Sequence, residues 1–427
     1  MSPARRAAPP PAAAREVTIA RIGPLGDGVA DGPLYVPGAL PGERVRIRPA
    51  ARGRAALEAV LSPSPERVAA PCPHAALCGG CSLQHWADAP YAAWKRGLLA
   101  EALARAGFPD APVAGLVRSP PGSRRRADLA LRRRRGGVLV GLHARGSAEV
   151  VELSTCLLLA PALVALLAPL RAALAPLSCL VREGSAVLNL LDTGPDLLLR
   201  TDAPPTAADR AALAAFGAAH GIPRIAWAPA DGPAEIVAQQ GPVRIAFAGV
   251  PVSPPPGAFL QATREGEAAI IAAVLAGLPG RVPGRRGLFD LYAGCGTLSL
   301  PLARHAPVRA FEGDAEAVSA LSAAARAAML PVAAARRDLA RQPLLPAELR
   351  EAAAVVLDPP FAGAPAQMPL LAQSGVPRII LVSCNPAALA RDARPLREAG
   401  YKVLAATPID QFPWSAHLES VVVFGQD

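Results

Sequence analysis

A stretch near the C-terminal end, from Arg378 to Pro386, places the tightest constraint on the fold. It begins with apolar, mostly β-branched residues and then changes to Ser-Cys-Asn-Pro. A continuous apolar run of this kind is typical of a strand buried on both faces, as in a parallel sheet. Because the Asn-Pro pair ends the strand, we expect Cys384 at the carboxyl end of a central strand. Open α/β sheets bind their ligands at that edge.

A lone cysteine is most often a small buried hydrophobic residue, so its position alone does not make Cys384 functional. Three other motifs in the chain favour a functional role for Cys384. A glycine-rich loop runs from Asp290 to Thr297, a second strand ends at Asp358, and Glu419 follows downstream. A thiol, a carboxylate and a ligand loop at one sheet edge indicate covalent catalysis with a proton-removal step.

The length and charge of the chain narrow its class. A chain of 427 residues is long enough for about two to four domains. The formal charge of +10 favours a polyanionic partner such as nucleic acid, although a solvated basic surface is the alternative. The apolar run from Leu157 to Leu177 is interrupted by prolines and an arginine, so we expect buried helix there and no membrane segment.

The cysteines indicate the compartment. Seven cysteines, an odd and clustered set, argue against a secreted disulfide framework and for metal binding or catalysis in a reducing compartment. We therefore expect a cytoplasmic protein.

Four regions follow from the pattern along the chain. Residues 1–14 are expected to be a disordered tail, and residues 15–63 contain short strands with Gly-rich turns that fit an OB-like, RNA-binding β-barrel. Residues 64–255 form a central α+β domain. Residues 256–427 form a Rossmann-like catalytic domain, against which an amphipathic helix at 91–106 could pack. The predicted fold class is thus multi-domain α/β.

A cysteine cluster opens the central domain. Three cysteines lie within ten residues, and glycines between them let the backbone wrap closely around a metal centre. The three are Cys72, Cys78 and Cys81, and the candidates for a fourth ligand are Cys156, His74 and His85. Zinc held by three cysteines and one histidine and an iron–sulfur cluster held by four thiolates are both compatible with this spacing.

Two arginine runs flank an alternating strand in the central domain, Arg124–Arg126 and Arg132–Arg135. They predict a dense positive face. Its functional interpretation is contact with an RNA backbone, with Arg124 and Arg126 as candidates, and the alternative is a solvated surface.

The glycine-rich loop of the last domain indicates a nucleotide-like cofactor. Gly294 and Gly296 bring the backbone close to a ligand, but Ser299 stands where a dinucleotide fingerprint has its third glycine. A cofactor without a pyrophosphate, S-adenosylmethionine, therefore fits better than a dinucleotide. Glu312 follows the second strand at the place of a ribose-binding acid, and Asp338 follows the third strand, where it could bind the adenine.

Taken in order, the motifs resemble those of the RNA 5-methyluridine methyltransferases, and the N-terminal barrel resembles the TRAM domain of that family. The resemblance covers nearly the whole chain beyond the tail. It is carried by the cysteine cluster followed by Gln84-His85, Phe259-Leu260-Gln261, Asp290-Leu-Tyr-x-Gly-x-Gly-Thr, Asp358-Pro-Pro, Ser-Cys384-Asn-Pro, and Asp410-x-Phe-Pro-x-x-x-His-x-Glu419.

The resemblance implies ligands and roles. It implies a 4Fe-4S cluster on Cys72, Cys78, Cys81 and Cys156. It implies that S-adenosylmethionine is bound by Gln261, the loop from Tyr292 to Gly296, Glu312 and Asp358. It implies Cys384 as nucleophile and Glu419 as base. Family members with both barrel and cluster often act on large-subunit ribosomal RNA, so we expect 23S rRNA as substrate, with the T-loop of tRNA as the alternative, and a monomeric enzyme.

Uracil chemistry agrees with these roles, because a thiolate adding at C6 activates C5 and a base must later remove the C5 proton. Two other functions fit the motifs less well. Methylation of cytosine C5 in RNA is disfavoured by the single Pro-flanked cysteine and the Glu419 motif, and a non-catalytic RNA-binding role by the intact Cys384 and Glu419. The chain departs from the family at Phe361, where arginine is usual, and at Thr263, where asparagine is expected.

Overall fold

The structure is a computed structural model that describes residues 13–32, 34–230, 232–282 and 286–426. The predicted tail therefore lies outside the described residues, apart from residues 13 and 14. The chain divides into two compact units. The first comprises Met1–Ala76, Gly80–Trp94 and Trp414–Ala416, and the second comprises Leu77–Gly79, Lys95–Pro413 and His417–Asp427.

The first unit contains a curled five-stranded antiparallel sheet. Its strands are β1 (Arg15–Ile22), β2 (Gly28–Ala30), β3 (Leu34–Val36), β4 (Arg44–Pro49) and β5 (Ala55–Ser62), in the order β3-β2-β1-β4-β5. The two ends of this order approach each other through a bridge between Tyr35 and Arg54. In β4, Val45 and Ile47 point into the core while Arg44, Arg46 and Arg48 face outward, as alternation in a half-buried strand requires.

The second unit contains two large sheets. The seven-stranded sheet has the order β13-β12-β11-β10-β7-β8-β9 and is antiparallel except for the β11–β12 pair. Its strands are β7 (Arg126–Arg134), β8 (Gly137–His143), β9 (Val150–Glu152), β10 (Glu183–Leu191), β11 (Gly194–Thr201), β12 (Arg224–Ala228) and β13 (Glu235–Gln239). Three helices accompany it, α2 (Pro161–Val164), α3 (Leu167–Leu174) and α4 (Ala207–Ala219).

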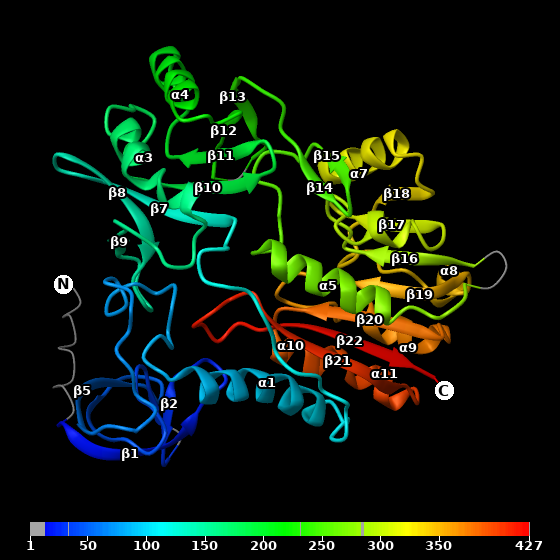
Figure 1. Cartoon of the computed structure of the whole chain (residues 1–427), viewed down its shortest axis with the longest axis horizontal. Coiled ribbons are helices and arrows are strands. Elements are labelled where there is room, and N and C mark those ends of the chain that lie inside the picture. Colours follow the sequence, from blue (N-terminus) through cyan, green and yellow to red (C-terminus); the bar gives the residue numbers. More distant parts are fainter. Residues whose placement is uncertain (1–12, 33, 231, 283–285, 427) are drawn as a thin grey trace, which may run out of the picture. The chain divides into compact units, whose positions relative to one another are not determined.

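The eight-stranded sheet carries the residues predicted to react. Its strands are β6 (Val117–Arg118), β16 (Gly287–Leu291), β17 (Val308–Glu312), β18 (Val332–Arg336), β19 (Ala352–Leu357), β20 (Arg378–Ser383), β21 (Lys402–Asp410) and β22 (Glu419–Gly425). They follow the order β18-β17-β16-β19-β20-β22-β21-β6, in which β22 alone runs antiparallel to both of its neighbours (Figure 1). A separate hairpin of β14 (Ile245–Phe247) and β15 (Val250–Val252) comes before β16 in the chain.

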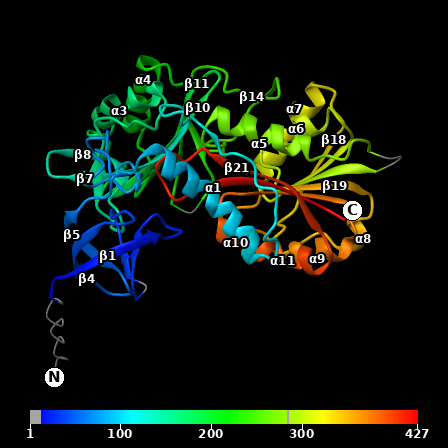
Figure 2. The same cartoon turned by 60° about the horizontal axis from the view of Figure 1, so that its bottom comes forward.

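Helices cover both faces of this sheet, which explains the continuous apolar strands. Every residue of β19 is buried, and so is every residue of β20 after Arg378. Figure 2 shows α5 to α7 on one side of the strands and α9 to α11 on the other. The helices of this domain are α5 (Arg264–Ala276), α6 (Ser299–Leu302), α7 (Ala315–Ala327), α8 (Pro346–Leu349), α9 (Met368–Ser374), α10 (Pro386–Asp392) and α11 (Arg394–Glu398); α1 spans Asp88–Arg105.

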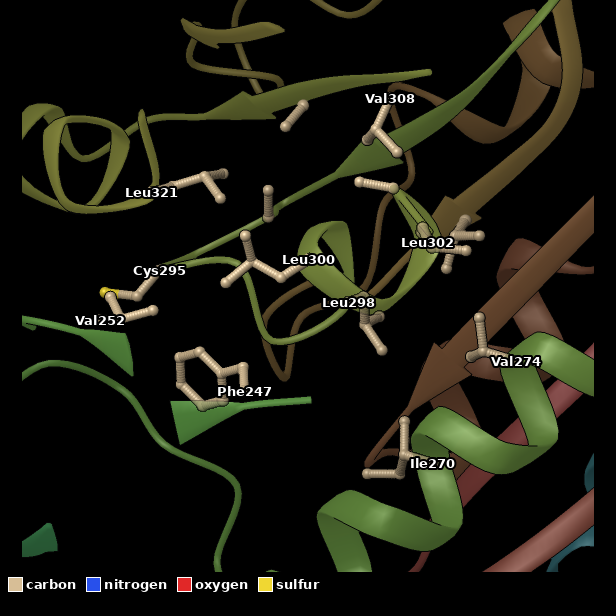
Figure 3. Packing of buried hydrophobic residues seen from close by; sticks show 14 of the residues in the cluster. Phe247, Val252, Ile270, Val274, Cys295, Leu298, Leu300, Leu302, Val308 and Leu321 are labelled. Atoms are coloured by element: carbon tan, nitrogen blue, oxygen red, sulfur yellow. The ribbon is translucent and has the colours of Figure 1, made fainter. Parts of the chain in front are cut away.

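The core beneath the glycine-rich loop is densely packed. Leu298, Leu300 and Leu302 turn into a cluster that also contains Phe247 and Ile270 (Figure 3). Cys295, within the loop itself, is buried in the same cluster. The loop therefore rests on an apolar base that holds its backbone in place.

None of the described helices combines the length and the apolar character needed to cross a membrane.

Candidate active site

Three parallel strands bring the predicted motifs to one edge of the sheet. Leu291 at the end of β16 is paired with Leu357 at the end of β19, and Leu357 is paired with Leu381 near the end of β20. The glycine-rich loop, Asp358 and Cys384 therefore all follow strand ends that lie side by side. This is the edge that the sequence predicts as the ligand site.

Cys384 and Glu419 occupy neighbouring positions on two antiparallel strands. The last pair of β20 and β22 joins Ser383 to Ser420, and the hydroxyl of Ser420 donates a hydrogen bond of 3.0 Å to the carbonyl oxygen of Ser383. Cys384 and Glu419 take the next positions beyond that pair. The charge of Glu419 contributes to a raised pKa of Cys384, so the thiol and the carboxyl group share one small region.

A chain of hydrogen bonds links the two acids of the site through two amides. The side-chain NH2 of Gln261 donates to Asp358 Oδ2 at 2.9 Å, and that of Gln411 donates both to Gln261 Oε1 at 2.7 Å and to Glu419 Oε2 at 2.8 Å. The backbone N–H of Ala262 donates to Gln411 Oε1 at 3.0 Å, which fixes the orientation of this amide. Sequence reasoning did not single out Gln411, although it lies within the Asp410-to-Glu419 motif.

The surroundings of the Glu419 carboxyl group increase its affinity for a proton. Its side chain is buried, and Oε1 has no hydrogen-bond partner in the described part of the chain. Burial, followed by the nearby charge of Asp358, raises the pKa of Glu419, while the hydrogen bond from Gln411 opposes that rise. Burial also raises the pKa of Asp358, against the hydrogen bond from Gln261. A buried carboxylate with an unused oxygen is suited to accept a proton from a bound substrate.

The environment of Cys384 favours its thiol over its thiolate. Burial, and then the charges of Glu419 and Asp358, raise its pKa to about 12. The following residue, Asn385, caps α10 by accepting the N–H of Ala387 at 3.0 Å. The helix therefore starts immediately behind the thiol, which fixes the backbone that carries it.

The glycine-rich loop is shaped to receive a ligand. Tyr292, Gly294 and Gly296 have φ angles of 66°, 53° and 99°. A Cβ atom on Gly296 would lie 2.5 Å from Leu321 Cδ1, so a side chain is excluded there, whereas a Cβ on Gly294 would meet nothing within 4 Å. Gly294 therefore leaves open space beside the loop, and its N–H donates to Glu312 Oε2 at 2.9 Å.

The other predicted cofactor residues surround this loop. Glu312 is half-buried, and its Oε1 accepts the N–H of Asp314 at 2.8 Å. Asp338 is exposed after β18 and accepts the N–H of Ala340 at 3.0 Å. Burial and then the charges of Asp392, Asp338 and Glu312 raise the pKa of Tyr292 to about 12, so these acids lie around the tyrosine.

S-adenosylmethionine fits the arrangement. Gly294 provides an open cradle, and the carboxylates of Glu312 and Asp358 can accept hydrogen bonds from a ribose or an ammonium group. The local negative charge suits a cofactor that carries a sulfonium cation. Thr263, a departure from the family, caps α5 by accepting the N–H of Gly266 at 2.9 Å, so it has a structural role.

The structure does not show the iron–sulfur cluster. All seven cysteines, each in the described part of the chain, are outside disulfides. Cys72 and Cys81 belong to the first unit, and Cys78 and Cys156 to the second. Among the described residues, no group of three or more His, Cys, Asp or Glu side chains could hold a metal ion.

The first arginine run is not a uniform positive face. Arg125 is buried, its Nε donates to the carbonyl oxygen of Gln261 at 3.0 Å, and its guanidinium pairs with Glu267. Arg124 and Arg126 are half-buried, and each guanidinium lies over an aromatic ring, Phe412 at 5.9 Å and Phe259 at 5.7 Å respectively. Arg125 thus braces the segment that carries Gln261.

Comparisons with known proteins agree with this geometry. Residues 328–426 match the family model described as tRNA (Uracil-5-)-methyltransferase. An RNA methyltransferase of Brucella suis is 42% identical over 417 residues, which cover 96% of this chain and 97% of the relative. The 23S rRNA (uracil(1939)-C(5))-methyltransferase of Alkalilimnicola ehrlichii is 36% identical over 441 residues, covering 96% of each chain.

A solved structure extends the comparison to the fold. The tRNA (uracil-54, C5)-methyltransferase of Pyrococcus abyssi, in complex with S-adenosyl-L-homocysteine, superposes with a TM-score of 0.71 and 20% identity, covering 96% of this chain and all of that one. This similarity concerns the fold. The two full-length relatives show that this chain belongs to the RNA (uracil-C5)-methyltransferase family.

Proposed function

We propose that this protein transfers a methyl group from S-adenosylmethionine to C5 of a uridine in 23S rRNA, through a covalent bond between Cys384 and C6 of the uracil. The observation that carries the proposal is the adjacent placement of Cys384 and Glu419 at the ends of β20 and β22, with Glu419 buried and held by Gln411. A covalent route needs one thiol and one base within reach of the same ring.

The chemistry balances with these two groups. The thiolate of Cys384 adds to C6, and the C5=C6 electron pair moves toward C5 and O4, which makes C5 nucleophilic. When bound, S-adenosylmethionine would supply the methyl group from its sulfonium centre: the new C5–methyl bond replaces the sulfur–methyl bond, whose electron pair stays on sulfur in neutral S-adenosylhomocysteine. Once C5 carries the methyl group, the carboxylate of Glu419 removes the C5 proton. The released pair restores the C5=C6 bond and expels the thiolate.

Neighbouring residues support these steps. Gln411 keeps one oxygen of Glu419 occupied, so that the other, Oε1, can take the proton. Gln261 and Asp358 continue the hydrogen-bonded chain toward the glycine-rich loop, on the cofactor side. Both reacting groups come from one copy of the chain, which supports action as a monomer.

Ribosomal RNA is the favoured substrate because the relative that acts on 23S rRNA matches at 36% identity over nearly the full chain. The tRNA enzyme of known structure matches at 20% identity. We keep the T-loop of tRNA as the second candidate. Mapping of 5-methyluridine in both RNA classes, from cells lacking this gene and from cells complemented with it, distinguishes them.

A 4Fe-4S cluster on Cys72, Cys78, Cys81 and Cys156 is proposed from the family resemblance alone, and no step above depends on it. Anaerobically purified protein should contain iron and sulfide, and replacing any one of these cysteines with serine should lower that content. Stoichiometric zinc without absorption in the visible range would contradict the cluster.

Two variants test the covalent mechanism. Cys384→Ala should abolish methylation while S-adenosylmethionine still binds. Glu419→Gln should allow addition and methyl transfer but not release, because the C5 proton remains. It should therefore accumulate as a denaturation-resistant protein–RNA adduct that carries labelled methyl and is collapsed by nuclease. Turnover by Glu419→Gln at the wild-type rate would exclude Glu419 as the base, and methylation by Cys384→Ala would exclude the covalent route.

A further inference from the structure

A row of ring and guanidinium groups leads away from the reacting residues. The rings of Phe361 and His417 have centroids 5.9 Å apart and meet edge to face, and the rings of Phe412 and His417 do the same, also at 5.9 Å. The guanidinium of Arg124 lies 5.9 Å from the centre of the Phe412 ring. We call these four residues the aromatic row.

Phe361 connects the aromatic row to the reaction centre. It lies three residues after Asp358, and its carbonyl oxygen accepts a hydrogen bond of 2.9 Å from the side-chain NH2 of Asn385, the residue after Cys384. The backbone of Phe361 is thus fixed against the segment that carries the nucleophile. Its side chain is nevertheless 56% exposed.

Single exposed apolar residues are common and need no explanation. Here the exposed ring of Phe361 contacts the ring of His417, which in turn contacts the ring of Phe412. The three rings thus form a continuous set that begins near Cys384. Desolvation and then the charges of Lys95 and Arg124 lower the pKa of His417, which favours the neutral form of its ring. Only Arg124 adds a positive charge, at the far end of the row.

We propose that the aromatic row binds an unpaired RNA base next to the target uridine, with the base stacked on Phe361 and the adjoining backbone phosphate near Arg124. This inference rests on the proposed function. A uridine that reaches Cys384 must leave its stack, so its neighbours in the RNA lose a stacking partner. An exposed ring fixed beside the thiol can replace that partner.

RNA suits the row better than a protein partner does. Base-on-aromatic stacking tolerates any base, since every base has a π face, and arginine interleaved with rings is typical of single-strand binding. The formal charge of +10 favours a polyanion. A peptide would offer no phosphate for Arg124.

The test compares Phe361→Ala with Phe361→Tyr, which keeps the ring, and with Leu345→Ala as a matched control. Leu345 is 55% exposed and has no contact with the aromatic row in the described contacts. Stacking is worth about 1–3 kcal/mol per base, so Phe361→Ala should raise the KM for an RNA fragment roughly 5- to 150-fold. The kcat and the Kd for S-adenosylmethionine should change little, and Phe361→Tyr should behave like the wild type.

Abasic substitutions identify the stacked nucleotide. In the wild type, removing the base at one flanking position should raise KM by a similar factor, and in Phe361→Ala the same removal should add nothing. A Phe361→Ala enzyme with the KM of Leu345→Ala, or losses that add independently at every flanking position, would overturn the inference. If instead the wild type transfers no methyl to uridine C5 in an RNA that it binds, the proposed function fails. The Kd for that RNA then tests stacking by itself: Phe361→Ala should raise it, and a Kd equal to that of Leu345→Ala would overturn the inference.

Discussion

We predict that Lys95 fixes the segment from Asp410 to Glu419, although none of the contacts described for it involves Cys384 or Glu419. Its side chain and that of Asp410 are both fully buried, and Lys95 Nζ donates to Asp410 Oδ1 at 2.8 Å. The same ammonium donates to the carbonyl oxygens of Phe412, at 3.3 Å, and His417. These contacts fix the chain directly before Gln411, directly after it, and shortly before Glu419.

The expected magnitude follows from burial. Removing one partner of a buried ion pair costs about 3–5 kcal/mol, because the other charge stays in the interior without compensation. Lys95→Met should therefore lower the free energy of unfolding by about that amount, measured by urea denaturation. It should also lower kcat, since the segment that places Gln411 and Glu419 loses its anchor. Adding Asp410→Asn should restore part of the stability, because no uncompensated charge remains.

A second buried pair provides the control. Arg224 and Asp196 pair through two contacts of 2.7 and 2.8 Å on β12 and β11, in the other large sheet. Arg224→Met should lose comparable stability without a change in kcat at temperatures where the protein remains folded. If Lys95→Met loses stability but keeps the kcat of this control, Lys95 supports the fold and not the catalytic geometry. If it loses less than about 1 kcal/mol, the burial argument itself is wrong.

Three further predictions concern the site and its surroundings. Gln411→Leu should lower kcat about ten- to hundredfold, because a hydrogen bond to a charged group contributes about 1.5–3 kcal/mol; an unchanged single-turnover rate would remove Gln411 from the mechanism. The kcat should rise from pH 6 to pH 9, because Cys384 and Glu419 both act without their protons and both have raised pKa values; a falling profile would contradict this assignment. Arg124→Ala should weaken RNA binding and lower the salt dependence of binding by about one unit, as for one lost phosphate contact, whereas an unchanged slope would mean that Arg124 contacts no phosphate.

The sequence predicted the parts of the fold that local pattern determines. The buried run before Cys384 is a central strand, and the glycine-rich loop follows a strand at the same edge. Alternating residues and Gly-rich turns predicted short strands forming an OB-like barrel in the first unit, where the structure has a curled antiparallel sheet. Each of these features is encoded within fewer than about ten consecutive residues. Over that length, the spacing of apolar residues predicts a strand or helix, and glycine and proline predict where it ends.

Long-range pairing could not be predicted in this way. The ion pair between Lys95 and Asp410 joins residues 315 positions apart, and neither residue has a local signal for burial. Arg125 lies inside a run of arginines that looks uniformly exposed, yet it is buried against the carbonyl of Gln261. Gln411 becomes significant only when three segments meet, since its partners come from separate parts of the chain.

The thiol of Cys384 must lose its proton before it can act as a nucleophile. Because its pKa is raised to about 12, we expect a bound ligand to lower that pKa during the reaction. Glu419 and Asp358 cause part of that rise, so a cation bound among these carboxylates should offset them and favour the thiolate. S-adenosylmethionine carries a positive sulfonium, whereas S-adenosylhomocysteine, nearly the same in shape, is neutral at sulfur. Alkylation of Cys384 by iodoacetamide, followed by mass spectrometry at saturating ligand, should therefore be faster with the first than with the second. Equal rates would mean that the thiolate forms without help from the cofactor charge, and RNA contacts would then have to supply it.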